Sequence, residues 1–160
     1  LLAVIGSPRL FLDFLASLYP EPGLLVLEIP EDVVQTEQPG LLGFLSQIRS
    51  LGIQFALTRF GLGLSGLNLL GRLKPDYLKI DRSFIAEVTR SRDAATIVRA
   101  MIELAHNLGL STCAEGVEDR ATHDFLLDVE CDHGQGFFYG RPGHPDDVAG
   151  RLVRKAAAAV

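Results

Sequence analysis

Polar side chains stand at the ends of several apolar runs that are typical of buried β-strands. The residues that close or directly follow these runs are Glu28, Thr58, Arg59, Lys79, Asp81, Glu115 and Gln135. In a parallel sheet the carboxyl ends of the strands meet at one edge, so we expect these side chains to converge. Carboxylate and amide oxygens there could hold a divalent metal, and the Lys79 ammonium could bind a phosphate.

Each of these side chains also has a purely structural interpretation. Glu28 would cap the amides of the helix that follows it. Lys79 would neutralise a strand end by pairing with Asp81 or Glu115. Gln135, which lies between two glycines, would satisfy the backbone of a loop.

Other polar residues are expected to be structural. Glu118 lies at a loop-to-helix turn and is interpreted as a capping or loop-bracing residue, and His106 falls on a helix rich in apolar residues. The remaining histidines have no metal-ligand spacing and are expected at the surface: His123, His133 and His144. Cys113 and Cys131 are too few for a disulfide framework and are interpreted as small buried thiols.

The composition predicts one globular domain over residues 1–160. The chain has 48% hydrophobic and 22% charged residues, and its formal net charge is -5. An acidic chain without a basic patch is not expected to bind a nucleic-acid polymer. No apolar run approaches the roughly 18–20 residues that cross a bilayer, and residues 1–5 are too short for a signal peptide. We therefore expect a cytoplasmic location, either alone or as the cytoplasmic part of a larger protein.

Six apolar runs predict strands, with helical stretches between them. The runs are residues 1–5, 24–29, 53–57, 77–80, 111–114 and 131–135. Most are continuously apolar, which is typical of parallel strands buried on both faces. Their spacing of roughly 20–35 residues leaves room for a crossover helix in each unit. A complete (β/α)₈ barrel takes about 250 residues, so the pattern predicts either a barrel that is incomplete at its N-terminal side or an open sheet.

Capping signals place the helices between these strands. Ser7 and Pro8 start the first helix, and residues 30–32 start a second that Pro39 and Gly40 interrupt. The other predicted helices are residues 41–51, 65–73, a helix from Asp81, 94–108, 118–129 and 145–159. The glycine-containing segment 58–65 is then a loop that follows a strand ending at Leu57.

Short motifs along the whole chain resemble those of bacterial EAL domains, the cyclic di-GMP phosphodiesterases. LEIPE is similar to the family's LEITE segment, FGLGLS to the end of its DDFGTGYSS loop, and KIDRSF and AEGVE match letter for letter. These motifs lie at residues 27–31, 60–65, 79–84 and 114–118, and the closing QG and GRP lie at 135–136 and 140–142. The resemblance runs from residue 1 to about 150. It implies a TIM-like (β/α)₈ barrel of the EAL type, here with about six βα units and without the first units.

The differences from the family pattern concern its metal ligands. The Glu-Ala-Leu segment that names the family, whose Glu binds metal, would lie upstream of Leu1. Ile5 stands where the family has an Asn ligand. Thr58 and Arg59 stand where the family has the two Asp ligands of the DDFG loop. The resemblance therefore implies a degenerate member.

The resemblance also assigns roles to the positions that are retained. Glu28 is a vestigial metal ligand, and Lys79, Glu115 and Gln135 correspond to the water-positioning, acid/base and amide positions. A bound cyclic dinucleotide would contact Arg59, Lys79, Asp81, Glu115, Gln135 and Pro142. The loop and the residues that brace it would be Glu31, Gly61, Gly63 and Glu118.

The family's reaction uses two metal ions, Mg²⁺ or Mn²⁺, to activate a water that attacks a phosphodiester. A fixed guanidinium at position 59 would repel a divalent ion by roughly 8 kcal/mol at about 4 Å and an effective dielectric constant near 20. We therefore expect no tightly bound metal cofactor and no efficient turnover by Lys79, Glu115 and Gln135. Residual metal-dependent hydrolysis of cyclic di-GMP to the linear dinucleotide is the alternative.

Two functions without catalysis are compatible with these residues. Arg59 and Lys79 could hold cyclic di-GMP as the ligand of a receptor, because guanidinium and ammonium groups bind phosphate. Alternatively, the chain would be a regulatory module that contacts another protein domain, or a second copy of itself, through the loop 60–67. In that loop Leu62 and Leu64 replace the Thr and Tyr of the family pattern.

Overall fold

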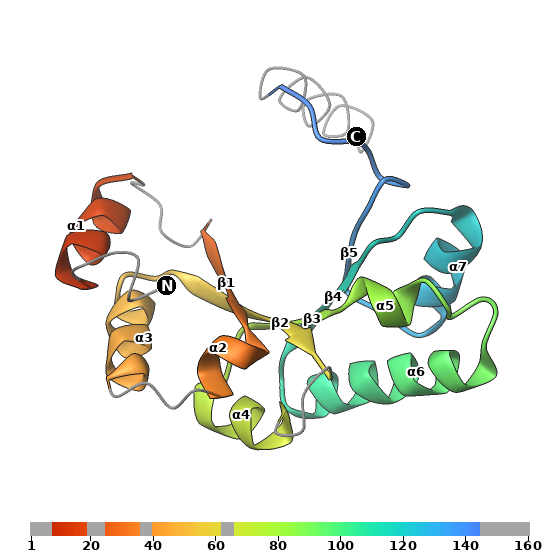
Figure 1. Cartoon of the computed structure of the whole chain (residues 1–160), viewed down its shortest axis with the longest axis horizontal. Coiled ribbons are helices and arrows are strands. Elements are labelled where there is room, and N and C mark those ends of the chain that lie inside the picture. The colour runs from red at the N-terminus through yellow and green to blue at the C-terminus, as the bar shows by residue number, and fades with distance from the viewer. Residues whose placement is uncertain (1–7, 19–24, 36–39, 62–65, 145–160) are drawn as a thin grey trace, which may run out of the picture.

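The computed structural model describes residues 8–18, 25–35, 40–61 and 66–144 (Figure 1). This part contains one five-stranded sheet in the order β1-β2-β3-β4-β5, and every neighbouring pair is parallel. The strands are β1 (Val26–Pro30), β2 (Gln54–Phe60), β3 (Tyr77–Ile80), β4 (Ser111–Glu115) and β5 (His133–Gln135). Sequential parallel strands are the arrangement of a barrel wall, and they bring all five carboxyl ends to one edge.

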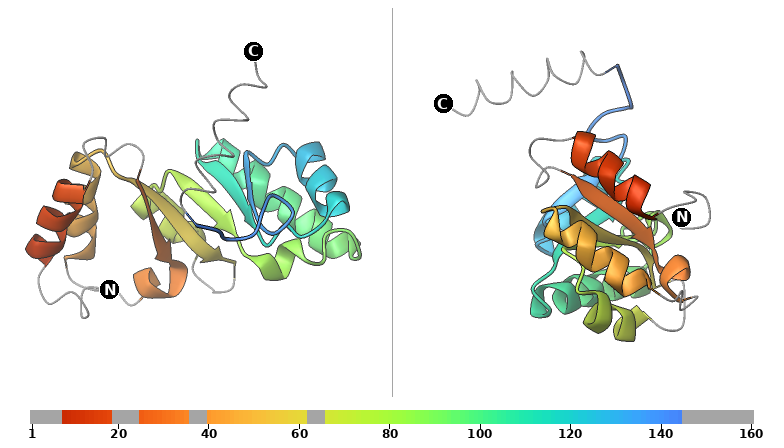
Figure 2. Two further views of the ribbon diagram at one scale, coloured as in Figure 1. Left: turned by 90° about the horizontal axis from the view of Figure 1, so that it is seen from above. Right: turned by 90° about the vertical axis from the view of Figure 1, so that its left-hand side faces the viewer.

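Helices connect these strands, as the capping signals predict. Their bounds are α1 (Pro8–Leu18), α2 (Glu31–Gln35), α3 (Leu41–Ser50), α4 (Gly66–Leu73), α5 (Arg82–Ile85), α6 (Arg92–Asn107) and α7 (Arg120–Asp128). Helices α3, α4 and α6 follow one another along the same side of the sheet (Figure 1). At the β1 end, α1 packs beside α3 (Figure 2), with the rings of Phe11 and Phe44 6.2 Å apart.

Two predicted elements, the strand at residues 1–5 and the helix at residues 145–159, lie outside the described residues. The prediction that β2 ends at Leu57 is wrong, because the strand continues to Phe60. Its pairing with β3 shifts register between Leu57 and Phe60, and Arg59 has a positive φ of 60°. The irregular backbone at Arg59 therefore lets the strand pair again at Phe60 with Ile80.

The hydrophobic core lies between the sheet and its helices. Alternate strand residues face the helices, and the deeply buried ones include Ile29, Phe55, Leu57, Leu78, Ile80 and Ala114. They pack against buried residues such as Phe44 and Ile48 of α3 and Val98 and Ile102 of α6. Because one strand face is used for the core, the intervening polar residues are directed to the other face.

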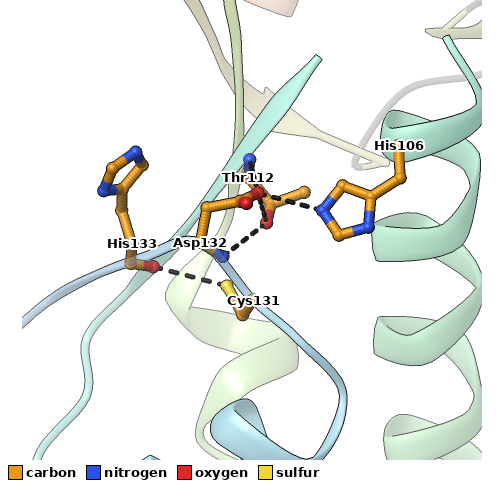
Figure 3. A network of polar contacts seen from close by, with 5 residues as sticks. All are labelled: His106, Thr112, Cys131, Asp132 and His133. Atoms are coloured by element: carbon orange, nitrogen blue, oxygen red, sulfur yellow. Dashed lines mark hydrogen bonds and ion pairs between the residues drawn. The ribbon is translucent and has the colours of Figure 1, made fainter. Parts of the chain in front are cut away.

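Aspartates fix the amino-terminal ends of two strands. Asp76 directly precedes β3, and its Oδ2 accepts the backbone N–H of Phe55 at 2.7 Å. Asp132 directly precedes β5, and its Oδ2 accepts the backbone N–H and the hydroxyl of Thr112, each at 2.7 Å. His106 Nε2 of α6 lies 2.9 Å from the same oxygen (Figure 3). Asp132 therefore ties the start of β5 to both β4 and α6.

Acid is expected to weaken this connection. Burial raises the pKa of Asp132, but hydrogen bonds from Thr112 and His106 outweigh burial and hold the pKa at about 2. A carboxylate with a depressed pKa stabilises the fold above the pKa of the unfolded chain, and that contribution is lost as pH falls from about 4 to about 2. We expect the free energy of unfolding to fall over this range in the natural chain, and to fall less in Asp132→Asn.

Urea-induced unfolding at a series of pH values measures this effect. Asp124→Asn is the control, because Asp124 pairs with Arg120 on the same surface helix. Equal pH dependence of the natural chain and Asp132→Asn would contradict the assignment.

No helix in the described ranges is both long and apolar enough to span a bilayer.

Candidate functional site

Lys79 of β3 is the centre of a polar cluster on the face of the sheet that is turned away from the core. Its Nζ donates hydrogen bonds to Glu28 Oε1 at 2.5 Å, to Glu115 Oε1 at 2.7 Å and to Gln135 Oε1 at 3.1 Å. The three acceptors come from β1, β4 and β5. An ammonium group has three protons, so this lysine cluster (Glu28, Lys79, Glu115 and Gln135) satisfies all of them.

The cluster keeps Lys79 charged. Burial lowers the pKa of Lys79, but the hydrogen bonds and charges of Glu115 and Glu28 outweigh it, so the pKa is raised. The Lys79 side chain is 6% exposed, whereas that of Glu28 is 54% exposed and that of Glu115 is 26% exposed. Of the interpretations that the sequence allows, pairing of Lys79 with Glu115 is confirmed. Asp81 instead caps α5 by accepting the backbone N–H of Ser83.

A cavity of about 260 Å³ lies beside the lysine cluster. It is lined by Val26, Glu28, Ala56, Tyr77, Lys79, Cys113, His133 and Gln135. The prediction that His133 is a surface residue is confirmed, since it is exposed. It also lines this cavity, and its ring lies 5.7 Å from that of Tyr77. Burial raises the pKa of the Cys113 thiol to about 11, so it is not a nucleophile at neutral pH.

Thr58 and Arg59 end up in different surroundings at the end of β2. Thr58 is buried and pairs in register with Pro30 of β1. Arg59 is exposed, and its Nη1 lies 3.4 Å from Asp32 Oδ2 in the first turn of α2. Arg59 and Lys79 therefore have different partners: Arg59 pairs with Asp32 of α2, and Lys79 pairs within the lysine cluster. The positive φ at Arg59 explains this, because it directs the side chain away from the alternation of the strand.

Asp81 lies within the electrostatic reach of Arg59. Its pKa is lowered, first by the hydrogen bond from the Ser83 backbone and then by smaller contributions that include the charges of Arg82 and Arg59. Arg59 therefore interacts electrostatically with two acidic residues at the carboxyl edge of the sheet, Asp32 and Asp81.

Glu31 braces the start of the loop that follows β2. It is 2% exposed, and its Oε2 accepts the backbone N–H of Gly61 at 3.1 Å. Gly61 has a φ of 89°, and a Cβ there would lie 2.7 Å from Met101 Cε, so both its backbone and its surroundings favour glycine. Ile5 and the loop residues 62–65, which include Gly63, lie outside the described residues.

Of the two roles predicted for Glu118, capping of α7 belongs to the next residue, and bracing of the loop stays a prediction. Asp119, not Glu118, accepts the backbone N–H of Thr122 at 2.7 Å. Glu118, which directly precedes Asp119, is exposed. Pro142, on the irregular segment after β5, is also exposed. Asp at an N-cap is as favourable as any residue, and the adjacent Glu118 is one position too early for the same bond.

Glycines let the loops at the carboxyl edge lie unusually close together. A Cβ on Gly116 would lie 2.6 Å from Arg82 Cβ, and a Cβ on Gly136 would overlap the backbone of Val117. These contacts join the three segments KIDRSF, AEGVE and QG, which each carry one member of the lysine cluster. The sequence interpretation did not identify Phe138 and Tyr139. The signal that could have found them is that two aromatic residues follow one another shortly after the last strand.

The described residues do not fit a two-metal centre. The space between Glu28 and Glu115 is already bridged by the Lys79 ammonium, and Thr58 offers a hydroxyl rather than a carboxylate. Across the ranges that the structure covers, no group of three or more His, Cys, Asp and Glu residues could hold a metal ion. Hard divalent cations need several oxygen ligands at close range, and the geometry provides a cation of its own instead.

Comparison with known proteins identifies the family. The EAL domain model matches residues 5–142. Over 122 residues the chain is 40% identical to the bifunctional diguanylate cyclase/cyclic di-GMP phosphodiesterase MucR of Pseudomonas aeruginosa, which corresponds to 76% of this chain and 18% of that protein. The chain thus spans less than a fifth of the length of this curated relative.

Solved structures agree with this match. The EAL domain of Mycobacterium smegmatis DcpA superimposes with a TM-score of 0.80 at 36% identity, over 90% of this chain and 66% of that one. The MucR phosphodiesterase in complex with cyclic di-GMP superimposes with a TM-score of 0.74 at 38% identity, over 80% and 52% of the two chains. The predicted TIM-like α/β fold is confirmed, and the five parallel strands are consistent with an incomplete barrel. The chain belongs to the EAL domain family, and the relatives that it matches include cyclic di-GMP phosphodiesterases.

Proposed function

We propose that this chain is a non-hydrolytic EAL module that binds cyclic di-GMP within a signalling protein. One observation carries the proposal: the Lys79 ammonium bridges Glu28 and Glu115 at 2.5 and 2.7 Å. The Lys79 ammonium thereby offsets one of the two negative charges of Glu28 and Glu115 and occupies one oxygen of each carboxylate. In-line hydrolysis with two metals requires carboxylates that are available to the metals.

The residues at the end of β2 support the same conclusion. Thr58 supplies no negative charge, and Arg59 supplies a permanent positive one. Its nearest acid, Asp32, is 3.4 Å away and forms an ion pair with it. A divalent ion at this edge would therefore meet one repelling guanidinium and an acid that is already paired.

Binding of cyclic di-GMP is supported by a solved relative and by the exposed guanidinium of Arg59. MucR is a phosphodiesterase whose structure was solved with cyclic di-GMP. Arg59 is 56% exposed at the edge of the sheet, so a phosphate can reach it by exchanging with Asp32. Lys79 is a less accessible partner, because a phosphate would have to displace Glu28, Glu115 or Gln135. Asp81, Glu115, Gln135 and Pro142 would form the other contacts of the ligand.

The proposal extends to the organisation of the protein. We place residues 1–160 in one domain that corresponds to the C-terminal two-thirds of an EAL domain. It would act in the cytoplasm as part of a larger signalling protein, without a tightly held metal.

Titration calorimetry and a hydrolysis assay test this function together. We expect the chain to bind cyclic di-GMP at micromolar to tens of micromolar concentrations without added metal, and Arg59→Gln to weaken binding by about tenfold, the loss of one charged phosphate contact. Arg120→Gln is the matched control, because Arg120 pairs with Asp124 on α7. No turnover is expected with Mg²⁺ or Mn²⁺.

Two outcomes would contradict the proposal. Conversion of cyclic di-GMP to the linear dinucleotide that is lost in Glu28→Gln would establish a residual phosphodiesterase. Absence of binding at tens of micromolar would instead favour an interaction module that uses the loop 60–67 to contact another domain or a second copy.

A further inference from the structure

A tyrosine stands behind β5, on the face opposite the lysine cluster. His133 and Gln135 line the cavity, so Gly134 between them faces the other way. Tyr139 occupies that side, since a Cβ built on Gly134 would lie 2.7 Å from Tyr139 Cε2. Burial raises the pKa of the Tyr139 phenol. The phenol ring therefore rests directly on the backbone of β5.

His123 of α7 holds this tyrosine in place. Its Nδ1 lies 3.0 Å from the Tyr139 hydroxyl, and the two rings meet edge to face with centroids 5.6 Å apart. The same imidazole stacks on Phe138 at 4.9 Å, and Phe138 packs against the core. Because α7 is itself anchored by its Asp119 cap and by buried Leu126, the helix holds His123 in a defined position.

Backbone hydrogen bonds secure the turn between β5 and the tyrosine. The Val117 N–H donates to the Gln135 carbonyl at 3.0 Å, and the Phe138 N–H donates to the Val117 carbonyl at 3.0 Å. The Tyr139 N–H donates to the Gly136 carbonyl at 3.1 Å. The turn 136–139 is thus held by the loop after β4 on one side and by α7 on the other.

The strand that carries Gln135 needs this support. β5 has three residues, and among the described strands it pairs only with β4. The Gln135 contact with Lys79, at 3.1 Å, is also the longest of the three that the ammonium makes. A small displacement of β5 would therefore break this contact first, since the contact is already near the upper end of the usual N–H···O range of roughly 2.7–3.2 Å.

We propose that His123 and Tyr139 are positioning residues that form a support behind β5 and keep Gln135 within hydrogen-bonding distance of Lys79. This role rests on the geometry of the lysine cluster alone. It holds whether or not the chain binds cyclic di-GMP.

The side-chain amide resonance of Gln135 in the full chain reports on this role. It is assigned by its disappearance in Gln135→Glu. In Tyr139→Phe, which removes only the hydroxyl, and in His123→Leu, we expect the resonance to move toward that of an exposed glutamine. His123→Asn should retain the natural position, because its amide can replace Nδ1 as the partner of the tyrosine hydroxyl. Asp124→Asn alters the neighbouring residue of α7 and should leave the resonance unchanged.

The outcomes separate positioning from simple stabilisation. A lower melting temperature of Tyr139→Phe and His123→Leu with an unchanged Gln135 resonance would overturn the proposal, because the pair would then only stabilise α7. A shifted resonance in a chain that binds no cyclic di-GMP would support the positioning role and contradict the proposed function alone.

Discussion

Replacement of Lys79 by methionine is expected to lower the free energy of unfolding by about 2–3 kcal/mol at neutral pH. The methionine fills a similar volume but leaves Glu28 and Glu115 without the cation that they share. The two carboxylates lie on the same face of the sheet, so they then repel each other, and each loses a hydrogen-bond donor. The loss is smaller than for a fully buried ion pair, because the Glu28 side chain is 54% exposed and stays hydrated. Urea-induced unfolding at pH 7 measures it.

Two further variants make this result specific. Lys74→Met is the same substitution at an exposed lysine and should change the free energy of unfolding by no more than about 0.5 kcal/mol. Adding Glu28→Gln and Glu115→Gln to Lys79→Met should recover most of the loss, because the amides carry no charge. If Lys79→Met were as stable as Lys74→Met, the lysine cluster would not be a stabilising unit.

Gly136→Ala is expected to destabilise the chain by about 3 kcal/mol or more. The new methyl group would overlap the backbone of Val117, whose carbonyl carbon lies 2.6 Å from the position of the Cβ. Backbone atoms cannot move aside as a flexible side chain does. Val117 is also fully buried, and its N–H and carbonyl each form a hydrogen bond to this segment. The substitution should therefore separate the loops after β4 and β5 and displace Gln135.

Gly43→Ala is the matched control for this prediction. Gly43 lies inside α3, and a Cβ there would have no atom within 4 Å. Alanine is the better helix former, so we expect a gain of about 0.5–1 kcal/mol. Thermal and urea-induced unfolding of both variants check the pair. Equal stabilities of the two alanine variants would show that the loops can separate without cost.

Much of the fold follows from local signals in the sequence. The strands 24–29, 53–57, 77–80, 111–114 and 131–135 are predicted to within a few residues, because each is a short apolar run between capping and turn residues. The end of β2 could not be placed in this way. It depends on the positive φ of Arg59, and an arginine gives no sign of such a backbone.

The candidate site was predictable in its membership but not in its contacts. Glu28, Lys79, Glu115 and Gln135 meet because each has the strand parity of the face opposite the core. Which side chains accept hydrogen bonds from Lys79 depends on the distances between residues of four different strands. The partner of Arg59 could not be predicted for the same reason, since it is Asp32 of another element.

The sequence by itself determined the family, the order of the elements and the edge at which the polar residues gather, because these depend on residue types and spacings along the chain. Only the tertiary structure decided that the Lys79 ammonium is fully satisfied, that Arg59 turns to α2, and that His123 and Tyr139 support β5. The physical reason is that these contacts join residues far apart in sequence, such as Lys79 with Glu28 at a separation of 51 and with Gln135 at a separation of 56. Spacing along the chain fixes the face on which a side chain lies, and only packing fixes its partner.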